Sequence, residues 1–185
     1  MSKDIQLSDS DGVLLVKAAR KAVTEFLSNG NRIKLESDLE KKFSFNSGVF
    51  VTLNNPDGLR GCIGFPLPEK KLSRAIVDGA IAAATEDPRF SPVKIKELDG
   101  IVFEVTVLTP PIEIDVINPT EYLEKIKVGR DGLIVRHSFS SGLLLPQVPV
   151  EYGWNVEEFL QHTCEKAGLL NDFWKNEDVK IEKFE

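Results

Sequence analysis

The sequence predicts an α+β fold in which helices flank a largely antiparallel sheet, with a smaller second lobe. Two observations carry this prediction. Helical and strand-like segments are interspersed along the chain, and several neighbouring strand segments are separated by only a few residues. Such short links join antiparallel strands and are too short for a parallel crossover. We expect residues 1–185 to form a single domain with a small lobe and no separable linker.

Helices are indicated by apolar residues at intervals of three and four. Asp9, Ser10 and Asp11 are suitable N-caps for a first helix, which Asn29-Gly30 ends. Further helices are expected over 37–42, 72–85, 118–128 and 156–167. The segment 72–85 is rich in alanine and should pack closely against its neighbours.

Strands are indicated by β-branched and apolar runs bounded by turn residues. The segments 48–53 and 59–65 should form a hairpin across a five-residue turn at 54–58. A second hairpin is expected from 133–137 and 143–145, with residues 140–142 as its turn. The remaining strands are 101–108 and an edge strand at 179–184.

Composition and charge describe an ordinary globular protein. Apolar residues make up 42% and charged residues 28% of the 185 residues, and the formal net charge is -6. A net negative chain repels nucleic acid unless it carries a local basic patch. The pairs Lys41-Lys42 and Lys70-Lys71 are the candidates, and because acids surround each pair, a solvated face is the favoured interpretation.

The beginning of the chain is polar and acidic and does not resemble a signal peptide. No apolar run reaches the roughly 18 residues that span a membrane. We therefore expect a cytoplasmic protein whose two cysteines, Cys62 and Cys164, are reduced.

The segment 59–64, Leu-Arg-Gly-Cys-Ile-Gly, is the best candidate for a functional site. Side chains alternate along a strand, so Arg60, Cys62 and Gly64 should share one face while Leu59, Ile63 and Phe65 face the core. A cation beside a cysteine favours the thiolate, which is the nucleophilic form. The pattern therefore predicts a thiol activated by Arg60.

Two glycines in this strand, Gly61 and Gly64, need a reason, because glycine weakens a strand. The usual reason is the close approach of another backbone or of a ligand, so both are candidate ligand-binding positions. The alternative is structural: a free cysteine often serves as a small buried filler, and glycines often mark a bulge. On residue chemistry alone, this structural alternative is favoured.

Glu104 lies within a β-branched strand, either on a solvated face or as a buried acid with a partner such as Arg60 or Arg89. If it meets the thiol, it is a candidate catalytic carboxylate. Arg89 follows a helix end, where it either binds a ligand or bonds the last carbonyls of the helix.

No motif indicates a cofactor. The two histidines, His137 and His162, have no zinc-ligand spacing to each other or to cysteine, so no metal is expected. Residues 61–64 lack the glycine pattern and the following Lys-Ser/Thr of a phosphate loop.

The hexapeptide at 59–64 resembles the signature of the AMMECR domain family. Other blocks in the same order resemble that family too: 48–53, 82–90, 142–148, Glu151 with Trp154, 158–160 and 164–169. The likeness covers roughly residues 11 to 175. It implies an α+β fold with a main sheet and a smaller lobe, with the hexapeptide near a cleft between them.

The resemblance implies no particular reaction. Similar domains occur beside or fused to Memo-like and radical S-adenosylmethionine proteins, which implies possible partners of those classes. The Cys-x-x-x-Cys-x-x-Cys motif of an iron–sulfur cluster is absent from this chain, so no cluster is expected here.

Two hypotheses follow. In the first, the segment lines a ligand-binding or catalytic cleft in which Cys62 and Glu104 act on a small molecule held by Arg60, Gly61, Gly64 and Arg89. In the second, the chain is a non-catalytic interaction module that supports a partner enzyme of the Memo-like or radical S-adenosylmethionine pathway. Neither hypothesis involves nucleic acid or a membrane.

Overall fold

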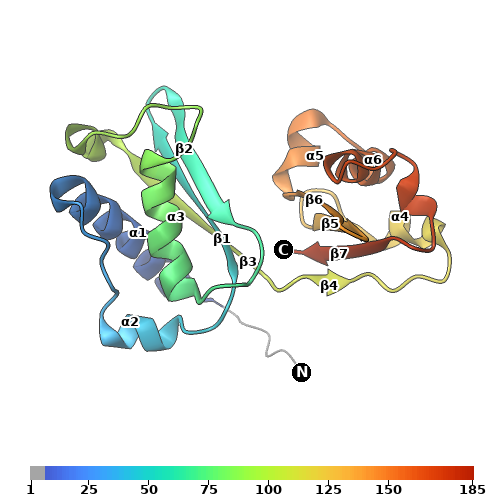
Figure 1. Ribbon diagram of the computed structural model, residues 1–185, viewed down its shortest axis with the longest axis horizontal. Coiled ribbons are helices and arrows are strands. Elements are labelled where there is room, and N and C mark those ends of the chain that lie inside the picture. Colours follow the sequence, from blue (N-terminus) through green and yellow to red (C-terminus); the bar gives the residue numbers. More distant parts are fainter. Residues whose placement is uncertain (1–6) are drawn as a thin grey trace. The chain divides into compact units, whose positions relative to one another are not determined.

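A computed structural model describes residues 7–185 and divides the chain into two compact units at Pro110-Pro111. Figure 1 shows that each unit combines one sheet with helices. All strand pairs in the described residues are antiparallel, so the α+β prediction is confirmed.

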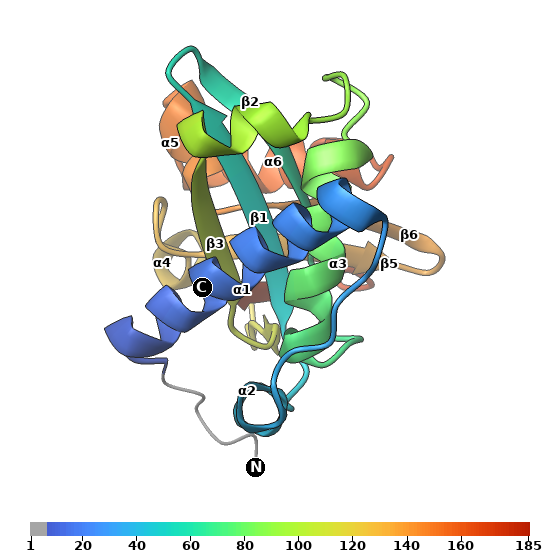
Figure 2. The same cartoon turned by 90° about the vertical axis from the view of Figure 1, so that its left-hand side faces the viewer.

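Unit 1 is a three-stranded sheet, in the order β2-β1-β3, with its two long helices on one face (Figure 2). Its elements are α1 (Asp9–Asn29), α2 (Ser37–Lys42), β1 (Gly48–Asn55), β2 (Gly58–Phe65), α3 (Leu72–Thr85), the 3-10 turn η1 (Ile95–Gly100) and β3 (Val102–Leu108). The predicted helices in this unit are confirmed. The N-cap of α1 is Ser8, whose hydroxyl accepts from the Asp11 backbone, rather than one of the three residues that follow it.

The side chains of β1 alternate between two faces. Val49, Val51 and Leu53 are fully buried beneath α1 and α3. Phe50 and Thr52 point to the opposite face, which we call the outer face of the first sheet. The site described below lies on this face and at the free edge of β2.

A bulge in β2 corrects part of the sequence prediction. Leu53 pairs with Gly61 and Asn54 pairs with Leu59, so Arg60 is an extra residue without a partner on β1. The extra residue reverses the alternation, and Leu59 is 41% exposed on the outer face instead of lying in the core. The strands also run longer than predicted, leaving only Pro56 and Asp57 between them.

The helix α3 lies very close to β2. A Cβ built on Gly61 would be only 2.1 Å from the backbone oxygen of Ala83 in α3. Three consecutive alanines of α3, Ala82–Ala84, are all buried, so small side chains on the helix and a missing one on the strand allow this approach.

Unit 2 is a four-stranded sheet in the order β4-β7-β5-β6, with α6 packed on β5 and β6. Its core contains Phe159, Leu160, Cys164 and Trp174. Its elements are β4 (Ile112–Glu113), the 3-10 turn η2 (Pro119–Glu121), α4 (Tyr122–Lys125), β5 (Gly132–His137), β6 (Ser140–Leu144), α5 (Gln147–Tyr152), α6 (Val156–Lys166), the 3-10 turn η3 (Phe173–Lys175) and β7 (Lys180–Phe184).

Three predictions in unit 2 were wrong in detail. β7 lies between β4 and β5 and is therefore not an edge strand. Residues 140–142 belong to β6, because the hairpin turns at Ser138 and Phe139, where Ser138 adopts φ 51. The helix expected over 118–128 is a 3-10 turn followed by the short α4. The Asn155 cap of α6 was predicted correctly.

The contact between Gly61 and Ala83 predicts a stability difference between two Gly→Ala variants. Gly61→Ala should lower the free energy of unfolding by about 3 kcal/mol, because the new methyl group meets rigid backbone. Gly79→Ala is the control, since Gly79 lies in α3 and a Cβ there would come no closer to its neighbours than 3.5 Å, an ordinary contact. Urea unfolding of both variants measures the difference, and equal stabilities would contradict this account of the α3 contact.

Candidate functional site

Cys62 lies on the outer face of the first sheet, half-buried and opposite Thr52 of β1. The Thr52 hydroxyl donates a hydrogen bond to Cys62 Sγ over 3.3 Å. The hydroxyl of Thr52 was not predicted as part of the site.

The backbone of Cys62 points away from β1, toward the free edge of the sheet. Its N–H donates to Asp87 Oδ2 over 2.8 Å, and its carbonyl accepts from Arg89 Nη2 over 3.4 Å. Both residues belong to the loop after α3. This loop therefore bonds the backbone N–H and carbonyl at the edge of β2, as a neighbouring strand would. Cys62 and Thr52 are therefore a non-hydrogen-bonded pair, in which side chains approach most closely.

Asp87 organises this loop. Its side chain is only 2% exposed, and it accepts from Arg89 Nε at 3.0 Å, from Arg89 Nη2 at 2.8 Å and from the Arg89 backbone at 3.1 Å. The hydrogen bonds from the Arg89 side chain, followed by those from the backbone of Cys62 and Arg89, hold the pKa of Asp87 well below its usual range despite burial. Asp87 is thus a buried anion with every partner that it needs.

Arg60 lies at the bulge of β2, and its activation of Cys62 stays a prediction. The bulge directs its side chain to Glu97 in η1, with Nε to Oε2 at 3.1 Å and Nη2 to Oε1 at 3.5 Å. A hydrogen bond from the Lys94 backbone and the bonds from Arg60 together lower the pKa of Glu97. Glu97 is thus the partner of the Arg60 guanidinium that the sequence assigned to the thiol.

Arg89 is the cation that the structure brings to Cys62. Its pKa is raised, first by its hydrogen bonds to Asp87 and to a smaller extent by the charges of Asp87 and Cys62. The Arg89 side chain is 55% exposed, so one part of the guanidinium is bonded to Asp87 while another is open to solvent. It does not bond the last carbonyls of α3, which was the alternative for this residue.

Glu104 lies in the same row of the sheet as Cys62. Thr52 pairs with Cys62 on one side and with Glu104 on the other. Glu104 is exposed and has no hydrogen-bond or ion-pair partner among residues 7–185, so it is the solvated acid of the two alternatives. Two strand spacings separate it from Cys62, about 10 Å between Cα atoms, which excludes direct proton transfer between the two side chains.

The two glycines have structural explanations. Gly61 leaves room for the backbone of α3. A Cβ on Gly64 would be 2.2 Å from the backbone oxygen of Val49 in β1. These backbone contacts account for both residues without a ligand.

The other sulfur and histidine groups belong to unit 2. Cys164 is buried in its core, and burial raises the pKa of this thiol to about 11. His162 stacks on Trp154 with ring centres 3.9 Å apart and bonds Glu165 at 2.8 Å.

Within residues 7–185, no cluster of His, Cys, Asp and Glu is arranged to hold a metal ion. No helix in this range is both long and apolar enough to cross a membrane.

Comparisons with known proteins agree over nearly the whole chain. The family model AMMECR1 matches residues 16–185. Protein MJ0810 of Methanocaldococcus jannaschii is 54% identical over 181 residues, which cover 97% of this chain and 89% of that protein. Protein PYRAB00100 of Pyrococcus abyssi is 51% identical over 184 residues, with the same coverages.

A solved structure is also similar. The crystal structure of the uncharacterized protein PH0010 from Pyrococcus horikoshii superposes with a TM-score of 0.86 at 51% identity, covering 97% of this chain and 91% of that one.

The lowered pKa of Asp87 predicts that the protein loses stability as the pH becomes acidic. A carboxyl whose folded pKa is depressed stabilises the fold above its unfolded value, about pH 3.9, and this stability is lost as the pH falls toward the lower folded value. Asp87→Asn should therefore lower the free energy of unfolding by about 2 kcal/mol at pH 7 and flatten its decline below pH 5.

Chemical denaturation between pH 7 and pH 2 measures this effect. Asp99→Asn, at an exposed position in η1, is the matched control and should follow the original protein. If the free energy of unfolding of Asp87→Asn falls with pH as steeply as that of the original protein, the bonds of Asp87 do not cause the loss of stability at acidic pH.

Proposed function

Because this chain belongs to the AMMECR1 family, whose matched relatives have names that specify no reaction, we propose its function from the geometry of unit 1. Cys62 contacts a small ligand on the outer face of the first sheet and acts on it as a nucleophile. The observation that carries the proposal is a half-buried thiol with a hydroxyl donor, Thr52, on its sulfur and a loop cation, Arg89, on the backbone carbonyl of the same residue.

The first step is the formation of a thiolate. We assign the Thr52 hydroxyl, which bonds Cys62 Sγ, and the Arg89 guanidinium, which bonds the Cys62 carbonyl, to the stabilisation of this thiolate. Asp87 contributes by holding Arg89 through two side-chain bonds, so that the guanidinium is fixed before a ligand arrives. Asp87 is in this sense a positioning residue.

The second step is the placement of the ligand. A molecule lying across Thr52 reaches Cys62 at one end and Glu104 at the other, over the row of about 10 Å. An electrophilic carbon would lie over the thiol, and Glu104 would bind or move a proton at the far end. Arg89 replaces Arg60 as the residue proposed for an anionic group of the ligand, because its guanidinium is partly open.

A second candidate function has its own observation. Leu59, Asn54 and Val102 form the next row of the outer face, and Leu59 and Val102 are 41% and 65% exposed. Exposed apolar side chains on a sheet suit a protein partner. This row supports the alternative in which the chain is a non-catalytic module for a partner such as a Memo-like or radical S-adenosylmethionine protein.

Alkylation of Cys62 tests the nucleophile. In a Cys164→Ala background, we expect iodoacetamide to modify Cys62, and Arg89→Gln and Thr52→Val each to slow the reaction by about fivefold at pH 7. Arg60→Gln is the matched control: it removes the same charge two residues from the thiol, but that charge is already paired with Glu97, so the rate should not change.

The measurement is the modification rate by mass spectrometry between pH 6 and pH 10, with thermal melting to show that each variant is folded. A thiol that resists the reagent, or that responds equally to Arg60→Gln and Arg89→Gln, would contradict the proposal.

Pull-down with Cys62→Ser and with Val102→Asp then separates the two candidate functions, the nucleophile and the interaction module. Loss of a partner only in the second variant favours the module.

A further inference from the structure

The two lysine pairs of the sequence meet in unit 1. Lys42 forms an ion pair with Asp11, and Lys70 forms one with Asp78. Their neighbours, Lys41 and Lys71, have no ion-pair partner among the described residues. These two unpaired lysines, one from each pair, line the same pocket between α2 and the beginning of α3.

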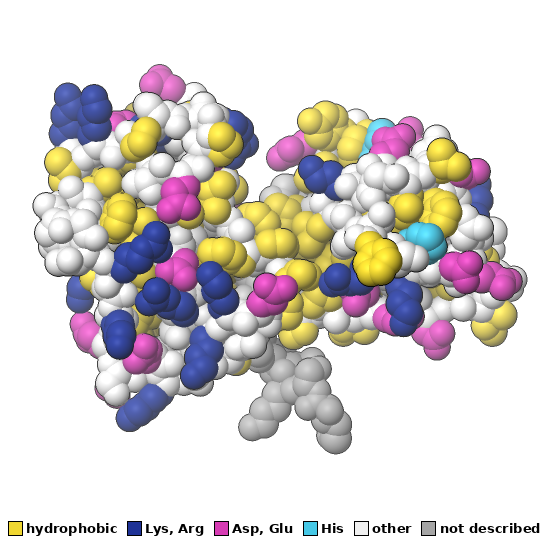
Figure 3. Space-filling model, in the orientation of Figure 1, with side chains coloured by type: hydrophobic (Ala, Val, Ile, Leu, Met, Phe, Trp, Pro, Cys, Tyr) yellow, Lys and Arg dark blue, Asp and Glu magenta, His cyan; other side chains and the backbone are white. Residues whose placement is uncertain are grey.

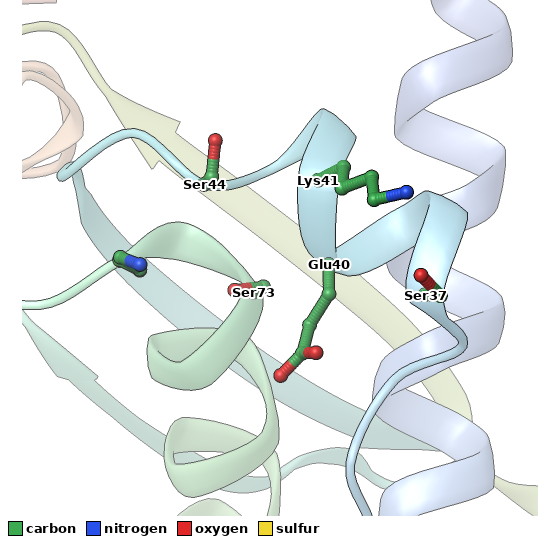
Figure 4. A pocket seen from close by; sticks show the side chains of 6 residues that line it. Ser37, Glu40, Lys41, Ser44 and Ser73 are labelled. Carbon is green, nitrogen blue, oxygen red and sulfur yellow. The ribbon is translucent and has the colours of Figure 1, made fainter.

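The pocket has a volume of about 380 Å³, within the range of sites for small ligands (Figure 4). All of its lining residues are of polar or charged type and come from α2, the link to β1 and the start of α3: Ser37, Glu40, Lys41, Ser44, Lys71 and Ser73. None of these six side chains has a hydrogen bond or an ion pair within residues 7–185. The pocket thus combines two free ammonium groups, one free carboxylate and three free hydroxyls.

Ser73 is the most informative member of this lining. The residue is only 6% exposed, yet its hydroxyl has no partner in the described chain. Among the described residues, the buried side-chain atoms without a partner do not include this oxygen, so the exposed part of Ser73 leaves its hydroxyl open to the pocket. A ligand in the pocket can therefore bond this hydroxyl, and Figure 4 shows Ser73 facing the segment that carries Glu40 and Ser44.

The backbone around the pocket is rigid. The N–H groups of Leu72 and Ser73 donate to the carbonyls of Phe45 and Phe43 over 2.8 Å and 2.9 Å respectively, and Asn46 forms a β-bridge with Lys71. Because these bonds occupy the first N–H groups of α3, a ligand would be bound by side chains rather than by the helix end. The side chains are held on a fixed frame, as a binding site requires.

Charge in this part of the molecule differs from that of the whole chain. Residues 1–110 contain 15 basic and 15 acidic residues, whereas residues 111–185 contain eight and 14, so the net charge of -6 comes entirely from unit 2. Figure 3 shows Lys and Arg side chains gathered over α2 and the beginning of α3. A neutral unit with a local group of cations attracts a small anion at this surface.

We propose that this pocket binds a small phosphorylated polyol, with the positive charges of Lys41 and Lys71 attracting the phosphate and Glu40 accepting hydrogen bonds from the hydroxyl groups of the ligand. The serine hydroxyls, including that of Ser73, form hydrogen bonds with both the phosphate and the hydroxyl groups of the ligand. Glu40 is the reason for a polyol rather than a bare anion, because a carboxylate repels free phosphate but accepts from a hydroxyl. The pocket is separate from the Cys62 site, which lies at the other end of α3.

Titration calorimetry at low ionic strength tests the proposal with three probes: inorganic phosphate, ribose 5-phosphate and ribose. Ribose 5-phosphate should bind more tightly than phosphate, and ribose should not bind. No saturable binding of ribose 5-phosphate by about 10 mM would overturn the proposal. Equal affinities for phosphate and ribose 5-phosphate would overturn the polyol assignment.

Charge variants locate the binding. The double variant Lys41→Gln and Lys71→Gln should weaken ribose 5-phosphate binding about tenfold. The control, Lys17→Gln with Lys96→Gln, removes the same charge at two exposed positions outside the pocket and should leave the affinity unchanged. Equal weakening in both double variants would show attraction by diffuse charge and overturn the site.

Two further variants separate ligand binding from folding. Ser73→Ala should weaken ribose 5-phosphate binding without lowering the melting temperature, since its hydroxyl bonds nothing in the protein. Glu40→Gln should strengthen the binding of inorganic phosphate while reducing the advantage of ribose 5-phosphate over it. A change of the same sign for both ligands in Glu40→Gln would contradict the role of Glu40.

Discussion

The close contact of α3 with β1 and β2 is the constraint on which unit 1 depends. The helix is buried along almost its whole length, and it can approach the sheet because Gly61 leaves room for the Ala83 carbonyl. This contact fixes both ends of the helix relative to the strands. At its C-terminal end, the following loop reaches the edge of β2 and bonds Cys62. At its N-terminal end, the first turn bonds the link between α2 and β1.

Local patterns predicted the secondary structure of unit 1 well because its helices and strands are long and regular. Helical spacing and alanine content located α1 and α3, and turn residues located the β1–β2 hairpin. The site was predicted less well, because one bulge changes the direction of two side chains. Nothing in the sequence marks Arg60 as an extra residue, so Leu59 was assigned to the core and Arg60 to the thiol.

Asp87 shows what sequence reasoning missed at the site. The sequence patterns did not single it out, and its role as the acceptor for Cys62 and Arg89 depends on contacts across the fold. One signal was present. An acid just beyond a helix C-terminus is unfavourable next to the helix dipole, so such a residue needs a compensating partner. Arg89, two residues later, was the available cation.

Whole-chain charge was similarly a poor guide to individual surfaces. The value of -6 describes unit 2, while unit 1 is neutral and has two unpaired lysines, Lys41 and Lys71, at one pocket between α2 and α3. The charge of a chain is a sum over its sequence, whereas a ligand responds to charges within about one Debye length, roughly 10 Å. Ion pairing within the fold decides which charges can attract a ligand. Lys42 and Lys70 are paired with acids, and their sequence neighbours Lys41 and Lys71 are not.

The two proposed sites of unit 1 share one rigid element but should act independently. The 14 residues of α3 separate them by about 20 Å, and tight packing leaves the helix no alternative position. Energetic coupling between distant sites requires an element with two arrangements that both ligands can bias. A helix locked by backbone contact at Gly61 is the opposite of such an element, and its contribution to each site is a fixed geometry in which Ser73 and Asp87 are already in place.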